Sequence, residues 1–77
     1  MNKKTLADLT VGHTARIEGL NGDAIGKRRL MALGLVRGRE ISLERRAPMG
    51  DPGIYAILGY RLSIRDDDAR NVVISNG

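Results

Sequence analysis

In VGHTARIEGLNGDAIGKRRLMALGL, residues 11–35, a strand pattern is followed directly by a helix pattern. In residues 11–20, small or apolar side chains alternate with polar ones, the period of two that is typical of a half-buried strand. Asp23 is a candidate helix N-cap, and the apolar spacing of residues 24–35 predicts one short helix that Gly34 ends. The inward strand positions are Ala15, Ile17 and Gly19, and the apolar helix positions are Ala24, Leu30, Met31, Leu33 and Leu35.

A second strand is predicted after Gly38, over residues 39–47, where alternation resumes. Arg45 falls on the inward parity, so we expect this end of the strand to lie at the mouth of a barrel, where a long side chain reaches water. The loop PMGDPG, residues 48–53, holds two prolines and two glycines and predicts a tight turn. The inward positions of the strand are Ile41, Leu43 and Ala47, and the outward ones are Ser42, Glu44 and Arg46.

The C-terminal part of the chain predicts a hairpin, a helical turn and a closing strand. Residues 54–58 are apolar on both parities, and residues 60–65 alternate, so Gly59 between them predicts a hairpin bent at glycine. DDDAR, residues 66–70, is expected to form one helical turn with acidic side chains at its positive end. A last strand follows at residues 72–74.

Five short strands with one short helix inserted after the first favour a mainly β fold, a small five-stranded SH3-like barrel. Leu6 and Leu9 precede the first strand and are expected to plug the core. A chain of 77 residues predicts a single domain, residues 1–77. The chain contains no cysteine, so disulfides and thiolate metal sites are excluded and close packing must carry the fold.

Charge and hydropathy indicate the compartment and the kind of partner. No apolar run approaches the roughly 20 residues of a membrane span, and TLAD, residues 5–8, interrupts any signal-peptide core. We therefore expect a cytoplasmic protein. The net charge of +4 favours an acidic partner, which leaves an acidic protein face, an anionic membrane surface and nucleic acid as alternatives.

No catalytic, cofactor or metal site is predicted from the residues, so we do not expect an enzyme. The single histidine, His13, has no nucleophile motif near it and cannot form a tetrahedral zinc site alone. The three aspartates of residues 66–68 point in different directions and lack the glycine and glutamate of a calcium loop. GDAIGKR, residues 22–28, is one residue short of a phosphate loop and has Arg28 where that loop needs serine or threonine.

Two basic clusters, residues 27–29 and 45–46, suggest RNA binding as an alternative function. Small barrels that bind single strands usually stack bases on aromatic rings. Tyr55 and Tyr60 are the only aromatic residues in the chain, which argues against this alternative. The same scarcity argues against a polyproline groove lined by aromatic rings.

Four segments resemble the FeoA family of ferrous iron transport accessory proteins. RLMALGLVRG, residues 29–38 and continuing through Ile41, carries most of the resemblance. APMGDP, residues 47–52, resembles the proline-glycine loop of that family, and GYRLSIR, residues 59–65, resembles its bent hairpin. The closing segment matches at Asp68 and Ala69 and again at residues 72–74.

One departure from the family pattern is that Arg37 stands where members commonly carry proline, directly before Gly38. Loss of proline raises the entropy of the unfolded chain, which costs a few tenths to about 1 kcal/mol without changing the fold. A charged side chain at this turn can also belong to a partner surface.

The resemblance implies an SH3-like domain, related to the C-terminal domain of iron-dependent repressors. It also implies a cytoplasmic accessory protein, recruited to the inner face of the membrane by FeoB, a ferrous iron transporter with a GTP-binding domain. Two alternatives stay open: the SH3-like domain of an iron-dependent repressor-type regulator, and the basic barrel that binds RNA. Small barrels keep edge strands that can pair with a second copy, so a homo-oligomer is compatible with the fold. Candidate partner contacts, chosen for expected exposure and for residue types enriched at interfaces, are Met31, Arg37, Arg45, Arg46, Met49 and Tyr55.

Overall fold

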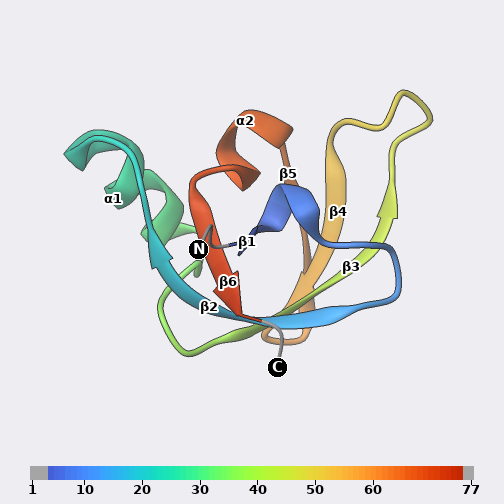
Figure 1. Ribbon diagram of the computed structural model, residues 1–77, viewed down its shortest axis with the longest axis horizontal. Helices are drawn as coiled ribbons and strands as arrows, with labels where there is room; N and C mark the ends of the chain where they lie inside the picture. Colours follow the sequence, from blue (N-terminus) through green and yellow to red (C-terminus); the bar gives the residue numbers. More distant parts are fainter. Residues whose placement is uncertain (1–3, 76–77) are drawn as a thin grey trace.

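The computed structural model describes residues 4–75, which form one antiparallel sheet and three short helices (Figure 1). The strands lie in the order β1-β6-β2-β3-β4-β5, so the last strand of the chain runs between the first two. The strands are β1 (Lys4–Thr5), β2 (Thr14–Leu20), β3 (Glu40–Arg46), β4 (Gly53–Ile57), β5 (Tyr60–Ile64) and β6 (Val72–Ser75). The helices are the 3₁₀ turn η1 (Leu6–Asp8), α1 (Ala24–Ala32) and α2 (Asp66–Ala69).

The expected small barrel is confirmed, with one addition. Five predicted strands and the helix that follows the first long strand are present, and β1 is a further two-residue strand that pairs with β6. The first long strand begins at Thr14 instead of residue 11, because Val11 and Gly12 form a turn. None of the helices within residues 4–75 is long and apolar enough to cross a membrane.

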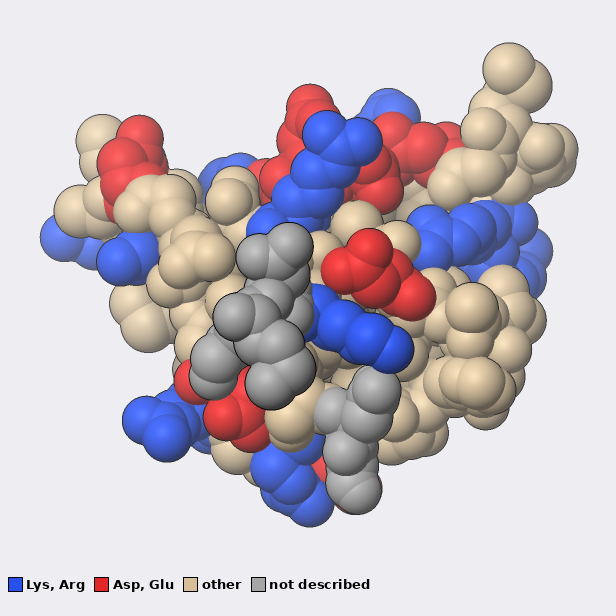
Figure 2. All heavy atoms as spheres, in the orientation of Figure 1, with Lys and Arg blue, Asp and Glu red and all other residues tan. Residues whose placement is uncertain are grey.

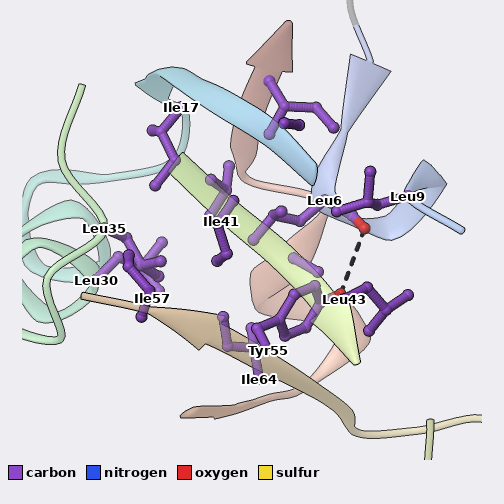
Figure 3. Packing of buried hydrophobic residues seen from close by; sticks show 14 residues of the cluster. Leu6, Leu9, Ile17, Leu30, Leu35, Ile41, Leu43, Tyr55, Ile57 and Ile64 are labelled. Carbon is purple, nitrogen blue, oxygen red and sulfur yellow. Dashed lines mark hydrogen bonds between the residues drawn. The ribbon is translucent and has the colours of Figure 1, made fainter. Parts of the chain in front are cut away.

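The sheet bends around one apolar core, to which every strand except β1 contributes (Figure 3). Leu6 and Leu9 are buried at one end of it, as expected. Tyr55 lies at 0% exposure inside the core, and its hydroxyl donates to the Leu6 carbonyl oxygen at 3.3 Å, the dashed line in Figure 3. The expectation that Tyr55 is exposed is therefore wrong. It fails because Tyr55 lies on the inward face of β4, together with Gly53 and Ile57.

The inward orientation expected for Arg45 is wrong, because β3 contains a β-bulge. The register with β4 shifts between Leu43 and Arg45, and an extra residue in one strand reverses the faces beyond it. Arg45 is exposed, and Arg46 turns toward the protein instead. The Arg46 guanidinium donates to the carbonyl oxygens of Leu9 at 3.0 Å and Ala7 at 3.4 Å, so this side chain ties β3 to the segment after η1.

The hairpin between β4 and β5 turns through two residues, both with positive φ. Leu58 has a φ of 51° and Gly59 a φ of 79°, which is the pattern of a type I′ turn that matches the twist of paired strands. The predicted bend at Gly59 is confirmed. Leu58 stays 60% exposed at the tip of this turn.

Helix α1 ends at Ala32, three residues before the predicted end. Its start is as expected, since the Asp23 carboxylate accepts a hydrogen bond from the Gly26 amide at 2.7 Å. Gly34, with a φ of 100°, turns the chain out of the helix, and Leu35 is then buried from a loop. The apolar residues between 24 and 35 thus belong to two backbone conformations, a helix and a loop. Those that are buried pack in the same core.

Candidate partner-binding groove

A groove of about 230 Å³ lies between α1, the end of β2 and the loop after α1. Its lining is almost entirely apolar, with two cationic side chains among its members. Pockets that bury a small molecule usually hold about 300 to 1,000 Å³, so this groove fits a single protruding side chain better than a metabolite. The residues that line it are Gly19, Leu20, Lys27, Met31, Leu35, Val36 and Arg37.

The helix wall of the groove follows from the spacing of residues along α1. Leu30 is buried and faces the core, where Figure 3 shows it beside Leu35 and pointing toward Ile57. Met31 is turned by about 100° from Leu30, as successive residues on a helix are, and stays 48% exposed. Lys27 precedes Met31 by four residues, so both side chains share one helix face.

The opposite wall is the loop from residue 33 to residue 38, and three side chains hold its backbone. The Tyr60 hydroxyl donates to the Leu33 carbonyl at 2.6 Å, and the Arg39 guanidinium donates to the Gly34 carbonyl at 3.0 Å. Arg16 donates to the Gly38 carbonyl at 2.7 Å. Tyr60 lies on β5, Arg16 lies on β2 and Arg39 directly precedes β3, so hydrogen bonds from three separate places hold the loop without a partner.

An ion pair holds α1 itself against α2. The Arg29 guanidinium donates to both carboxylate oxygens of Asp68, at 2.7 and 3.1 Å, which is the bidentate geometry of strong arginine pairs. These hydrogen bonds hold the pKa of Asp68 below its usual value. Arg29 therefore has a structural partner, which removes one of the three charges in the basic cluster of residues 27–29.

Lys27 and Arg37 differ from Arg29 because neither has an ion-pair partner among residues 4–75. The ion pairs of this part of the chain join Arg16 to Glu40, Arg29 to Asp68, Arg61 to Glu44 and Arg70 to Asp66. Figure 2 shows both basic and acidic groups at the left of the view, where α1 lies in Figure 1. The groove is thus apolar inside and positively charged at its rim.

The six candidate contacts fall into separate places. Met31 and Arg37 line the groove. Arg45 and Met49, which is 93% exposed, lie on the β3–β4 hairpin, away from α1 in Figure 1. Arg46 and Tyr55 are held inside by hydrogen bonds to backbone carbonyls. The structure therefore does not bring the six residues into one surface.

Sequence reasoning missed Leu20, Leu35 and Val36 as groove residues. Extending the predicted helix to residue 35 placed Leu35 on a helix face, when it belongs to the loop that walls the groove. Gly34 was already predicted to end the helix, and this prediction places Leu35 in the following loop although Leu35 was counted with the helix positions.

No group of three His, Cys, Asp or Glu side chains within the described residues is arranged to hold a metal ion. His13 Nδ1 and the Thr10 hydroxyl share one hydrogen bond of 2.8 Å, and both residues are exposed.

Burial raises the pKa of the Tyr55 hydroxyl, which therefore stays protonated as a donor.

The chain is similar to known proteins over nearly its whole length. The family model for the FeoA domain matches residues 4–76. A curated relative, the "Fe(2+) transport protein A/Fe(2+) transporter FeoB fusion protein" of Porphyromonas gingivalis, is 32% identical over 69 residues. These cover 90% of this chain and 8% of that protein, so the chain spans a small part of this relative.

Two solved structures share the fold. The FeoA-like protein of Clostridium acetobutylicum is 32% identical, with a TM-score of 0.89, and the match covers 99% of this chain and 90% of that one. The FeoA of Stenotrophomonas maltophilia, solved with zinc and described as an SH3 domain protein, is 28% identical with a TM-score of 0.80, over 94% and 89% of the two chains. With its SH3-like barrel and a family match from residue 4 to residue 76, this chain belongs to the FeoA family.

Proposed function

We propose that this chain is a cytoplasmic accessory protein of ferrous iron uptake that binds the cytosolic part of a FeoB-type transporter. The observation that carries the proposal is the fusion protein of Porphyromonas gingivalis, in which a segment related to this chain belongs to the same polypeptide as FeoB. Segments joined in one chain in one organism often act on each other as separate chains elsewhere. The chain acts by binding alone, with no chemical step of its own.

The groove supports a role in protein binding. An exposed methionine beside an apolar groove, with charged residues at its rim, matches the usual composition of protein interfaces. A bound accessory protein changes the transporter only if it binds one conformation more tightly than another. We therefore expect its affinity to differ between the GDP-bound and GTP-bound forms of the transporter.

The test is a binding titration of the full chain against the cytosolic GTP-binding domain of a FeoB-type transporter, with GDP and with a non-hydrolysable GTP analogue. Met31→Asp should weaken binding by about tenfold or more, because a carboxylate then enters an apolar contact. Leu58→Asp is the control, since it places the same carboxylate at an exposed apolar residue outside the groove. If the wild type binds neither in the presence of GDP nor in the presence of the GTP analogue, the proposal is refuted.

A further inference from the structure

The charged rim of the groove indicates the kind of ligand more narrowly than its apolar floor does. Lys27 lies on α1 and Arg37 on the facing loop, and both line the same groove. Each is without an acidic partner among residues 4–75. Within the same range, other cations such as Arg28, Arg45 and Arg65 are unpaired too, but they do not line this groove. Two cations that the fold leaves unpaired on facing walls favour a ligand that brings its own negative charges.

The shape of the groove limits what that ligand is. With about 230 Å³ and an almost wholly apolar lining, the groove has room for one side chain and offers few groups to a phosphate. A nucleic acid would leave Leu20, Met31 and Val36 in contact with sugar or phosphate, which gains little from apolar surface. A ligand with an apolar side chain flanked by carboxylates contacts the apolar floor with that side chain and the cations of the rim with its carboxylates.

The groove is also formed in advance. Its loop wall is held by Tyr60 and Arg39, and its helix wall by Leu30 in the core and by the Arg29–Asp68 pair. A surface that is already ordered loses less conformational entropy on binding, so a small contact can still be specific.

From these observations, and resting on the function proposed above, we infer that the groove binds an acidic segment of the partner protein. The segment inserts one apolar side chain between α1 and the loop of residues 33–38, and its carboxylates lie against Lys27 and Arg37. The partner is thereby defined by chemistry: an apolar residue with Asp or Glu within about one helical turn on either side.

The experiment compares two double charge reversals of the full chain in the titration described above, at low and at high ionic strength. Lys27→Glu with Arg37→Glu should weaken binding by about tenfold or more and remove most of its salt dependence. Lys4→Glu with Arg65→Glu is the control, because it changes the same residue types and the same net charge at exposed residues outside the groove. It should alter affinity by less than about threefold. The neutral pair Lys27→Gln with Arg37→Gln should fall between the wild type and the reversal, and thermal unfolding checks that each variant is folded.

The outcomes separate this inference from the proposed function. If the wild type binds and the groove reversal binds as tightly as the control, the inference is overturned and the proposed function stands. If the wild type does not bind at all, both are overturned. If the groove reversal alone is weakened, replacing an acidic residue of the partner by lysine should restore binding, and this rescue identifies the segment.

Discussion

Gly34 offers the sharpest test of how the loop wall is built. Its φ of 100° is a conformation that side chains other than glycine reach only at a cost, about 1–3 kcal/mol for a strained residue. A Cβ at this position would also lie 2.6 Å from the Tyr60 hydroxyl oxygen, which donates to the Leu33 carbonyl. Displacing that hydroxyl costs about a further 1 kcal/mol. Gly34→Ala should therefore lower the free energy of unfolding by about 2–4 kcal/mol.

Gly38 supplies the matched control. Its φ of 93° is similar, but a Cβ there meets no atom within 4 Å, so Gly38→Ala should cost the backbone strain alone. Urea unfolding of both variants, each in the wild type and in a Tyr60→Phe background, gives the coupling free energy. We expect Gly34→Ala to cost about 1 kcal/mol more than Gly38→Ala, and most of this excess to disappear in Tyr60→Phe, where Arg39 Nη1 at 3.3 Å is the close contact that is left. Equal costs in the wild type, or an excess that persists in full without the hydroxyl, would refute the reasoning.

Three further predictions concern side chains that tie the barrel together. Tyr55→Phe should lower the free energy of unfolding by about 1 kcal/mol in urea melts, because it removes a buried donor to a backbone carbonyl of η1. Arg46→Met should cost about 1–2 kcal/mol, whereas Arg45→Met on the exposed face should cost less than about 0.5 kcal/mol; similar costs would contradict the bulge assignment. Because the pKa of Asp68 is lowered in the folded state by Arg29, its contribution to stability is complete above the unfolded pKa of about 3.9 and is lost as pH falls through the lower folded value. The stability difference between wild type and Asp68→Asn should thus be constant near neutral pH and shrink in acid, and a difference that grows in acid would count against the pair.

Alternation of side chains predicted the strands well because each strand has one face on the core. Ile17 and Ile64 are buried where the period of two placed them. The pattern failed at Arg45, since a bulge adds one residue without leaving a mark in the local sequence. For Tyr55, the run of apolar residues 54–58 gave no clear alternation, so the sequence did not show which face of the strand was buried; in the structure it is the face of Tyr55 and Ile57.

Only some of the groove residues could be predicted from the sequence. Met31 and Arg37 were selected by residue type, and both line it. Its depth depends on Leu20 and Val36, which come from separate segments, and no single stretch of sequence shows that they meet. The unpaired state of Lys27 was equally hidden, because the pairing of Arg29 with Asp68 spans 39 residues.

The place of β6 in the sheet has a consequence for synthesis. Because β6 lies between β1 and β2, the N-terminal strands cannot pair through it until residues 72–75 have been made. On the ribosome, Ile17 cannot pair with Ile74, its partner across the sheet, until residue 74 has emerged. Such pairing between distant residues is slow compared with local helix formation. The barrel should therefore close only after residues 72–75 have left the ribosomal tunnel, and a ribosome stalled shortly before β6 should hold a chain that proteases still cut.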